Sequence, residues 1–188
     1  MLFRSEAKKF PIKENEKTSP LNPYAASKIA AEKQILSYAK KFHLPYSILR
    51  YANVYGPRQR ADSEGGVISI FSNNILQKKP IKIFGDGTQT RDFIYVHDVT
   101  RANYLSLFSR SSFIANVSSN KEVSILKLAR LIERLSGKKA KIIFKPKKAG
   151  EITKSRLDNF HLKHVLKWQP EVGVQTGLSK TLKYLDGK

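Results

Sequence analysis

Tyr24 and Lys28 are the residues whose types and spacing most directly suggest chemistry. They lie four positions apart in the stretch LNPYAASKIAAEKQ, where Asn22 can cap a helix and Pro23 can be its first residue. Residues i and i+4 of a helix share a face, so the Lys28 ammonium can lie beside the Tyr24 hydroxyl. A nearby cation stabilises a phenolate, which can then act as a general base near neutral pH.

The same spacing also arises by coincidence in a chain with 8 Tyr and 25 Lys. It occurs again at Tyr184 and Lys188, where no neighbouring motif accompanies it, and there we interpret it as a surface coincidence. The surrounding sequence therefore has to decide what Tyr24 and Lys28 do.

The elements that must position this pair alternate between helices and strands. The first helix is expected to end near Phe42, because Pro45 follows shortly after it. We expect a long polar loop at 52–66. Strands are expected within 46–51, 113–117 and 140–144 and on both sides of a glycine turn in 80–96. Further helices are expected at 67–79, from an Asp98 cap to about Phe108, and from a Ser124 cap to Gly137. Two short helices are expected near 159–167 and near 175–185. This alternation is typical of an α/β fold with largely parallel strands.

Charge and composition narrow the classes of function. The 188 residues carry a formal net charge of +20, which admits a nucleic-acid partner, but the lysines are dispersed and outnumber the arginines 25 to 10. We therefore expect no nucleic acid as the main partner and an anionic small substrate instead. No apolar run reaches the length of a membrane span, so no membrane partner is expected. The absence of cysteine excludes disulfides and thiolate metal sites and favours a cytoplasmic location.

Five stretches occur in one order: PLNPYAASKIAAE, LRYANVYGPRQ, GDGTQTRDFIYVHDVTRA, ANVSSNKEVSILKLA and AGEITKSRLD. In this the chain resembles the extended short-chain dehydrogenase/reductase family, and within it the nucleotide-sugar epimerases of the UDP-glucose 4-epimerase type. The resemblance implies an incomplete Rossmann-type sheet, doubly wound and mainly parallel, plus a small α/β substrate-binding lobe. Residues 1–66 would be the remnant of the NAD-binding domain, and 67–188 mainly the substrate lobe with the last nucleotide-domain elements interleaved.

The resemblance also implies a reaction and a cofactor. With NAD, such an enzyme inverts C4 of a nucleotide sugar, expected here to be a UDP-sugar, through a 4-keto intermediate. Tyr24 would take the proton of the sugar 4-hydroxyl, and Lys28 would bind the nicotinamide ribose. Tyr51 and Val54 match the stretch that lines the nicotinamide. A 4,6-dehydratase or decarboxylase of the same family is the alternative enzyme, and a non-catalytic binding module is the alternative of another class.

Six positions match substrate contacts of the family: Asn53, Val67, Ile83, Phe84, Arg91 and Lys148. Arg91 would bind the diphosphate, for which a guanidinium fork is suited. Judged by residue type alone, Arg91 could instead form a surface pair with Asp92. Ile83 and Phe84 could be plain core, and Asn53 a turn former.

The dinucleotide fingerprint Gly-x-x-Gly-x-x-Gly is absent from the 188 residues. By comparison with the family, we expect a chain truncated at its N-terminus and inactive alone. The family forms homodimers through the helix that carries the Tyr-x-x-x-Lys pair and the helix before it. Because that preceding helix is not in this sequence, we expect such pairing to be weakened here.

Overall fold

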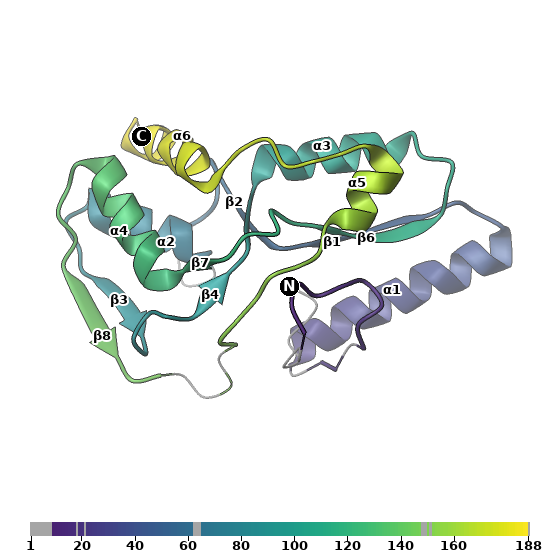
Figure 1. Ribbon diagram of the computed structural model, residues 1–188, viewed down its shortest axis with the longest axis horizontal. Coiled ribbons are helices and arrows are strands. Elements are labelled where there is room, and N and C mark those ends of the chain that lie inside the picture. The colour runs from purple at the N-terminus through teal and green to yellow at the C-terminus, as the bar shows by residue number, and fades with distance from the viewer. Residues whose placement is uncertain are drawn as a thin grey trace.

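The computed structural model describes residues 9–17, 19–20, 22–61, 65–147, 150 and 152–187. Parallel pairing joins β1 (Ser47–Tyr51) to β6 (Phe113–Val117), β2 (Asn53–Tyr55) to β5 (Phe93–Tyr95), and β3 (Ile81–Phe84) to β8 (Ile142–Lys145) (Figure 1). β4 (Thr90–Arg91) pairs antiparallel with β7 (Val123–Ser124). The expected α/β class with mainly parallel strands is confirmed.

The helix that carries Tyr24 and Lys28 has the bounds that the sequence predicts. α1 spans Pro23–Phe42, with Pro23 as its first residue and Asn22 as its cap. The Asn22 side chain accepts a hydrogen bond from the Ala25 amide at 2.8 Å, which satisfies a donor that the first turn leaves free. His43 ends the helix in the left-handed conformation.

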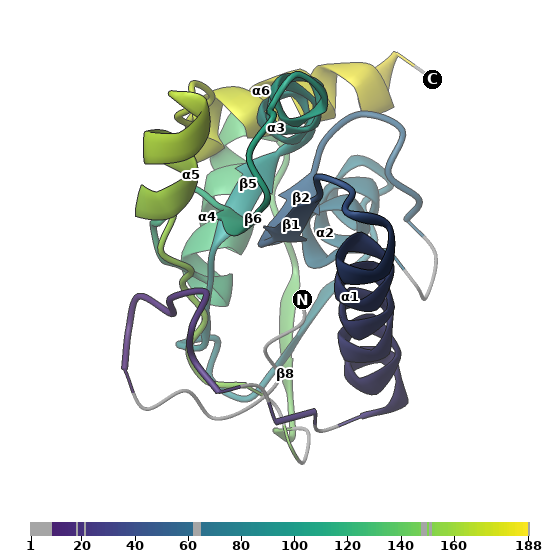
Figure 2. The ribbon, with the colours of Figure 1, turned by 90° about the vertical axis from the view of Figure 1, so that its right-hand side faces the viewer.

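Five further helices lie within the described ranges. They are α2 (Val67–Leu76), α3 (Val96–Leu107), α4 (Ile125–Ser136), α5 (Phe160–Leu166) and α6 (Val174–Asp186). Figures 1 and 2 place α3 and α5 on one side of the β1–β6 pair and α1 on the other. α4 has the predicted ends, because Ser124 caps the Lys127 amide and Gly137 takes the left-handed conformation.

Two expectations about the elements are wrong, and one short strand was missed. The predicted loop at 52–66 contains strand β2, and the short strand β7 was not expected. Asp98 does not cap α3, which begins at Val96 after the cap residue Tyr95. Asp98 is fully buried, and its carboxylate accepts hydrogen bonds from the amides of Glu171 and Val172 at 3.0 and 3.1 Å. Its task is therefore to fasten the segment before α6.

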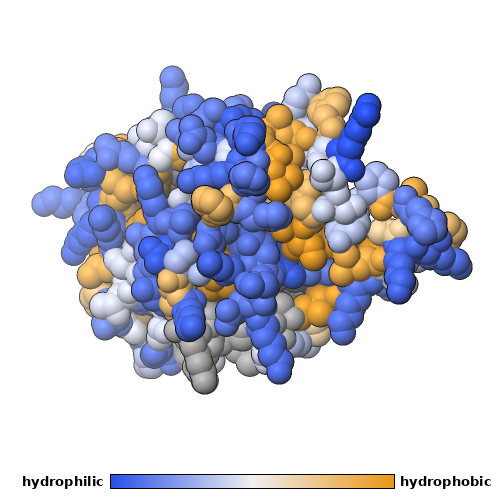
Figure 3. Space-filling view, turned by 45° about the vertical axis from the view of Figure 1, so that its right-hand side comes forward, coloured by the Kyte–Doolittle hydropathy of each residue, from blue (hydrophilic) through white to orange (hydrophobic). Residues whose placement is uncertain are grey.

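Several large apolar side chains remain on the surface. Figure 3 shows hydrophobic side chains gathered on the side of the molecule that carries α1, between hydrophilic areas. α1 itself exposes Ile35, Tyr38 and Phe42, and the C-terminal end of α3 exposes Leu107 and the cap residue Phe108.

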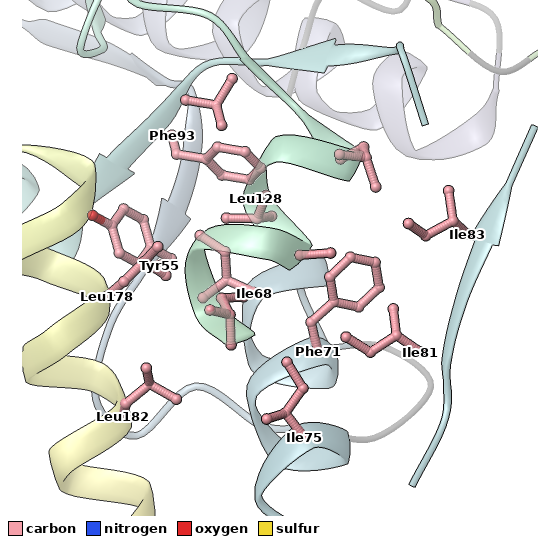
Figure 4. Close-up of a cluster of buried hydrophobic side chains, with 14 of the residues drawn as sticks. Tyr55, Ile68, Phe71, Ile75, Ile81, Ile83, Phe93, Leu128, Leu178 and Leu182 are labelled. Atoms are coloured by element: carbon pink, nitrogen blue, oxygen red, sulfur yellow. The ribbon is translucent and has the colours of Figure 1, made fainter. Parts of the chain in front are cut away.

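Two apolar clusters form the core. The first packs α2, α4 and α6 against β3 and the aromatic ends of β2 and β5, as Figure 4 shows around Tyr55, Phe71 and Leu178. The second lies around β6 and includes Ala115 and Trp168. Both clusters draw residues from before and after position 66, and the domain division at that position stays a prediction.

Candidate functional site

A pocket of about 530 Å³ lies where the ends of β2, β3 and β4 meet the start of α2. Its volume falls in the range of small-molecule sites. Five of the six positions expected to contact substrate line it: Asn53, Val67, Ile83, Phe84 and Arg91. The sixth, Lys148, lies outside the described residues. These five come from four different elements that are separated in sequence, and the fold brings them to one surface.

Backbone contacts orient the two polar side chains of the predicted set that line the pocket, Asn53 and Arg91. The Asn53 side-chain amide donates to the carbonyl of Asp92 at 2.9 Å, and the Asn53 backbone amide donates to the same carbonyl. Arg91 Nη1 donates to the carbonyls of Thr90 and Ile152, both at 2.8 Å. Because Asp92 directly follows Arg91, the contacts of Asn53 with the Asp92 carbonyl hold Asn53 and Arg91 near each other.

Apolar side chains form the rest of the predicted set. Ile83 is buried in the first core cluster and also lines the pocket, so its core role and its pocket position hold together. Phe84 follows it at the end of β3 and is half-buried, while Val67 is the first residue of α2. The pocket therefore combines a flat aromatic ring with a guanidinium and an amide.

Asp92 is a residue of this region that the sequence did not identify. It is fully buried, and its carboxylate accepts hydrogen bonds from the Ser119 hydroxyl at 2.7 Å, the Ser119 amide at 2.9 Å and the Leu157 amide at 3.2 Å. Burial raises the pKa of the Asp92 carboxyl, and these hydrogen bonds offset part of that effect. The alternative of an Arg91–Asp92 surface pair is wrong, because Asp92 is buried and engaged elsewhere.

Tyr24 and Lys28 share a face of the first turns of α1. The Lys28 ammonium lies 5.3 Å from the centre of the Tyr24 ring, and the Tyr24 side chain is 55% exposed. Within the described part of the chain, neither the Tyr24 hydroxyl nor the Lys28 ammonium has a hydrogen-bond partner. Both polar groups are therefore available to a ligand.

Tyr51 and Val54 do not line the pocket. Tyr51 ends β1, and its hydroxyl donates to the Asn103 side chain of α3 at 2.8 Å. Val54 packs partly against the second core cluster, and its carbonyl accepts from the Gln59 side chain at 3.1 Å. Their expected place beside the nicotinamide stays a prediction.

Residues 5–117 match the model of the NAD dependent epimerase/dehydratase family. This match spans more than half of the 188 residues. The chain belongs to this family. The resemblance read from the five sequence stretches is thereby confirmed.

Individual members of this family are similar over nearly the whole chain. A putative UDP-glucose 4-epimerase of Methanocaldococcus jannaschii is 38% identical over 175 residues, which are 93% of this chain and 57% of the relative. The crystal structure of UDP-glucose 4-epimerase from Thermotoga maritima with UDP-glucose matches with a TM-score of 0.94 and 36% identity, over 98% of this chain and 60% of that one. A complex of UDP-glucose 4-epimerase from Thermus thermophilus with NAD has a TM-score of 0.86 and 34% identity, over 93% and 57% of the two chains.

The two matched crystal structures confirm the expected Rossmann-type architecture. The chain spans a little under three fifths of the length of the curated relative.

Within the described ranges, no group of three or more His, Asp or Glu residues could hold a metal ion. None of the helices found in that part of the chain is both long enough and apolar enough to cross a membrane.

Proposed function

We propose that this epimerase-family chain carries the acid/base pair and the substrate pocket of an NAD-dependent nucleotide-sugar 4-epimerase. The supporting observation is the convergence of Asn53, Val67, Ile83, Phe84 and Arg91 on one pocket. A guanidinium suits a diphosphate, and an aromatic ring beside it suits a nucleobase. A nucleotide sugar contains both groups, and a UDP-sugar is the substrate that we propose.

In the proposed reaction Tyr24 transfers one proton, and Lys28 stabilises the charged form of Tyr24. The Tyr24 phenolate removes the proton of the sugar 4-hydroxyl as the C4–H bond breaks, and the C4–O bond becomes a carbonyl. NAD, when bound, would supply the acceptor of the hydride from C4 and later its donor. The 4-keto sugar turns over in the site before it regains that hydrogen on its other face, and Tyr24 returns the proton to oxygen. Lys28 stabilises the phenolate in both directions.

The residues present fit one end of NAD. The unengaged hydroxyl of Tyr24 and ammonium of Lys28 suit the ribose next to the nicotinamide. The pyrophosphate is usually held by backbone amides of a glycine-rich turn at a helix N-terminus, and the 188 residues contain no such fingerprint. We therefore expect residues 1–188 alone to bind NAD at about millimolar affinity or weaker, because one or two hydrogen bonds supply only about 1–3 kcal/mol.

The product of the reaction tests the proposal. The chain would be joined to the part of the Methanocaldococcus jannaschii relative that it does not span, and incubated with NAD and UDP-glucose or UDP-N-acetylglucosamine. We expect the C4 epimer of at least one substrate, and we expect Tyr24→Phe to abolish its formation. Tyr184→Phe, at the other Tyr-x-x-x-Lys spacing, is the matched control and should leave the rate unchanged.

The family also includes dehydratases, which gives the alternative a specific basis. A 4,6-dehydratase or decarboxylase would convert the same 4-keto intermediate irreversibly. Accumulation of a keto-sugar without an epimer would therefore overturn the epimerase proposal while keeping the roles of Tyr24 and Lys28. Equal epimer formation by the Tyr24→Phe protein would overturn those roles.

A further inference from the structure

A buried ion pair joins α1 to the β1–β6 strand pair. Arg50 Nη2 lies 2.7 Å from Glu32 Oε2, and Arg50 Nε donates to Glu32 Oε1 at 2.8 Å, so that two parallel hydrogen bonds link the fork of each group. The side chains of Arg50 and Glu32 are only 8% and 12% exposed. Such a pair fixes direction as well as distance, because the guanidinium and the carboxylate must stay coplanar.

Apolar packing holds α1 weakly by comparison. Of its 20 residues only Ala25 and Ala39 are buried, and an alanine side chain contributes little buried area. Figure 2 shows α1 as a separate rod beside the sheet strands. The Glu32–Arg50 pair therefore largely determines how α1 is rotated about its axis and where α1 lies along that axis.

The Arg50 end of the pair is itself fixed. Arg50 is the fourth residue of β1, and its Nη1 donates to the carbonyl of Glu14 at 2.9 Å. The Glu14 carboxylate accepts a hydrogen bond from the backbone amide of Asn116 in β6 at 2.8 Å. Arg50 is thus held by the strand, by the segment before α1 and through it by β6.

Tyr24, Lys28 and Glu32 follow one another at intervals of four residues. Residues at this spacing lie on one face of a helix, each turned slightly from the one before. At the other end of the pair, β1 leads within three residues from Arg50 to Asn53, which lines the pocket. The ion pair therefore connects the face of α1 that carries Tyr24 and Lys28 to the segment of chain that leads from β1 to Asn53 in the pocket.

We propose that Glu32 and Arg50 are positioning residues, which set the orientation of α1 and so aim the Tyr24 hydroxyl and the Lys28 ammonium relative to the substrate pocket. This inference rests on the proposed function, because the direction of the Tyr24 and Lys28 side chains matters only if they act on a substrate. Stability alone does not require an ion pair here, because a well-packed apolar pair of similar volume usually stabilises a protein at least as well. The double variant Glu32→Met/Arg50→Met separates the two roles, since it removes the link without leaving a lone buried charge.

The position of α1 can be measured directly, because the chain has no cysteine. Ser27→Cys on the exposed side of α1 and Lys121→Cys in the exposed turn after β6 would carry two spin labels, and pulsed electron paramagnetic resonance would give the distribution of the distance between them. We expect one narrow distribution in the otherwise unchanged protein. In the Met/Met background we expect a shifted or clearly broader distribution, together with an unfolding free energy close to the original.

Hydrogen exchange gives a second readout of the same link. In Glu32→Gln, which leaves Arg50 without its counter-charge, the α1 amides should exchange about 100-fold faster or more, the factor that corresponds to about 3 kcal/mol. The β6 amides should change less. Glu171→Gln is the matched control, because it breaks an ion pair of the same 2.7 Å length whose carboxylate side chain is 54% exposed. It should leave α1 exchange unchanged.

Two results would overturn the inference. One is a Met/Met protein with the original narrow distance distribution, and the other is a Glu32→Gln protein whose α1 amides keep their protection. Neither measurement needs turnover, so the outcome is separate from that of the epimerase assay. Loss of the α1 orientation together with a catalytically silent Tyr24→Phe change would uphold the effect of the ion pair on α1 and refute the acid/base role proposed for Tyr24.

Discussion

The guanidinium of Arg91 reaches the pocket already oriented. Two backbone carbonyls, of Thr90 and Ile152, each accept a hydrogen bond from its Nη1 atom. An arginine held in this way is oriented before a phosphate arrives, so that it loses little side-chain entropy on binding. A lysine at the same position would keep the charge and lose the fork.

Arg91→Lys should therefore weaken the binding of UDP-glucose. A hydrogen bond to a charged group is worth about 1.5–3 kcal/mol, so the loss of one predicts a dissociation constant about 10- to 100-fold higher. Competition with a fluorescent UDP derivative would measure it. Arg110→Lys is the control, because Arg110 lies outside the pocket. Equal affinity of the Arg91→Lys and unchanged proteins would remove Arg91 from the diphosphate site.

Asp92 predicts a pH dependence of stability. Its pKa in the folded chain is raised above the ordinary value of 3.8, mainly by burial. A carboxyl of this kind favours folding most when it is protonated, and the advantage is lost as the pH rises through the raised pKa. Relative to Asp92→Asn, the unchanged protein should therefore lose unfolding free energy as the pH rises from about 4. Urea unfolding of both proteins over a pH series measures the difference. If the unchanged protein instead gains unfolding free energy relative to Asp92→Asn as the pH rises, the hydrogen bonds from Ser119 and Leu157 affect the Asp92 pKa more than burial does.

At the scale of elements, the sequence predicted what local chemistry decides. The caps Asn22, Ser124 and Gly137 mark helix ends by side-chain oxygen or by left-handed backbone, and these ends were found where expected. The short strands β2 and β7 were missed because strands of two or three residues form through pairing with distant segments. Periodicity within such short stretches is too brief to detect.

The residues of the candidate site were also hard to predict, because their positions depend on segments that are distant in sequence. Its pocket residues could be placed only through the family motifs, since nothing in the residue type of Val67 or Ile83 indicates a pocket. Asp92 and Asp98 were missed because a buried carboxylate looks like a surface or capping residue until its distant amide partners are known. Arg50, a single charge inside the apolar strand Ser47–Tyr51, is a signal that could have been used.

Gly177 allows α6 to lie close against the aromatic ends of β2 and β5. A β-carbon at this position would collide with the Tyr55 hydroxyl and approach Tyr95 Cδ2 to 2.9 Å. Gly177→Ala should therefore lower the unfolding free energy by about 1–3 kcal/mol, a loss reduced by the better helix propensity of alanine. Adding Tyr55→Phe, which removes the nearest atom, should recover part of it. Urea unfolding of the four proteins tests this, and a more stable Gly177→Ala protein would contradict the packing argument.

At the scale of the whole molecule, a high positive charge is combined with exposed apolar side chains. The net charge of +20 opposes association of copies at low salt, and its effect weakens as salt screens it. Ile35, Tyr38 and Phe42 form an exposed stripe along α1, with 44%, 65% and 52% of their surfaces accessible. Their spacing of three and four residues puts them on one helix face.

We predict weak self-association through this stripe, increasing with salt. In sedimentation velocity at high micromolar concentration, Tyr38→Ser/Phe42→Ser should shift the chain toward monomer. Leu107→Ser/Phe108→Ser changes an even more exposed pair at the C-terminal end of α3 and should leave the association unchanged. A strictly monomeric chain at all salt concentrations would show that the α1 stripe alone does not support pairing.

We propose that the pocket lined by Asn53, Phe84 and Arg91 binds a nucleotide sugar. The most direct test is a pair of calorimetric titrations of residues 1–188, with UDP-glucose and with NAD. We predict weak, saturable binding of UDP-glucose that UDP competes away, because Asn53, Phe84 and Arg91 line the pocket. We predict no measurable NAD binding, because the glycine fingerprint is not in these residues. No saturable heat with UDP-glucose would mean that the pocket does not bind a nucleotide sugar, and micromolar affinity for NAD would mean that NAD binding does not need the glycine fingerprint.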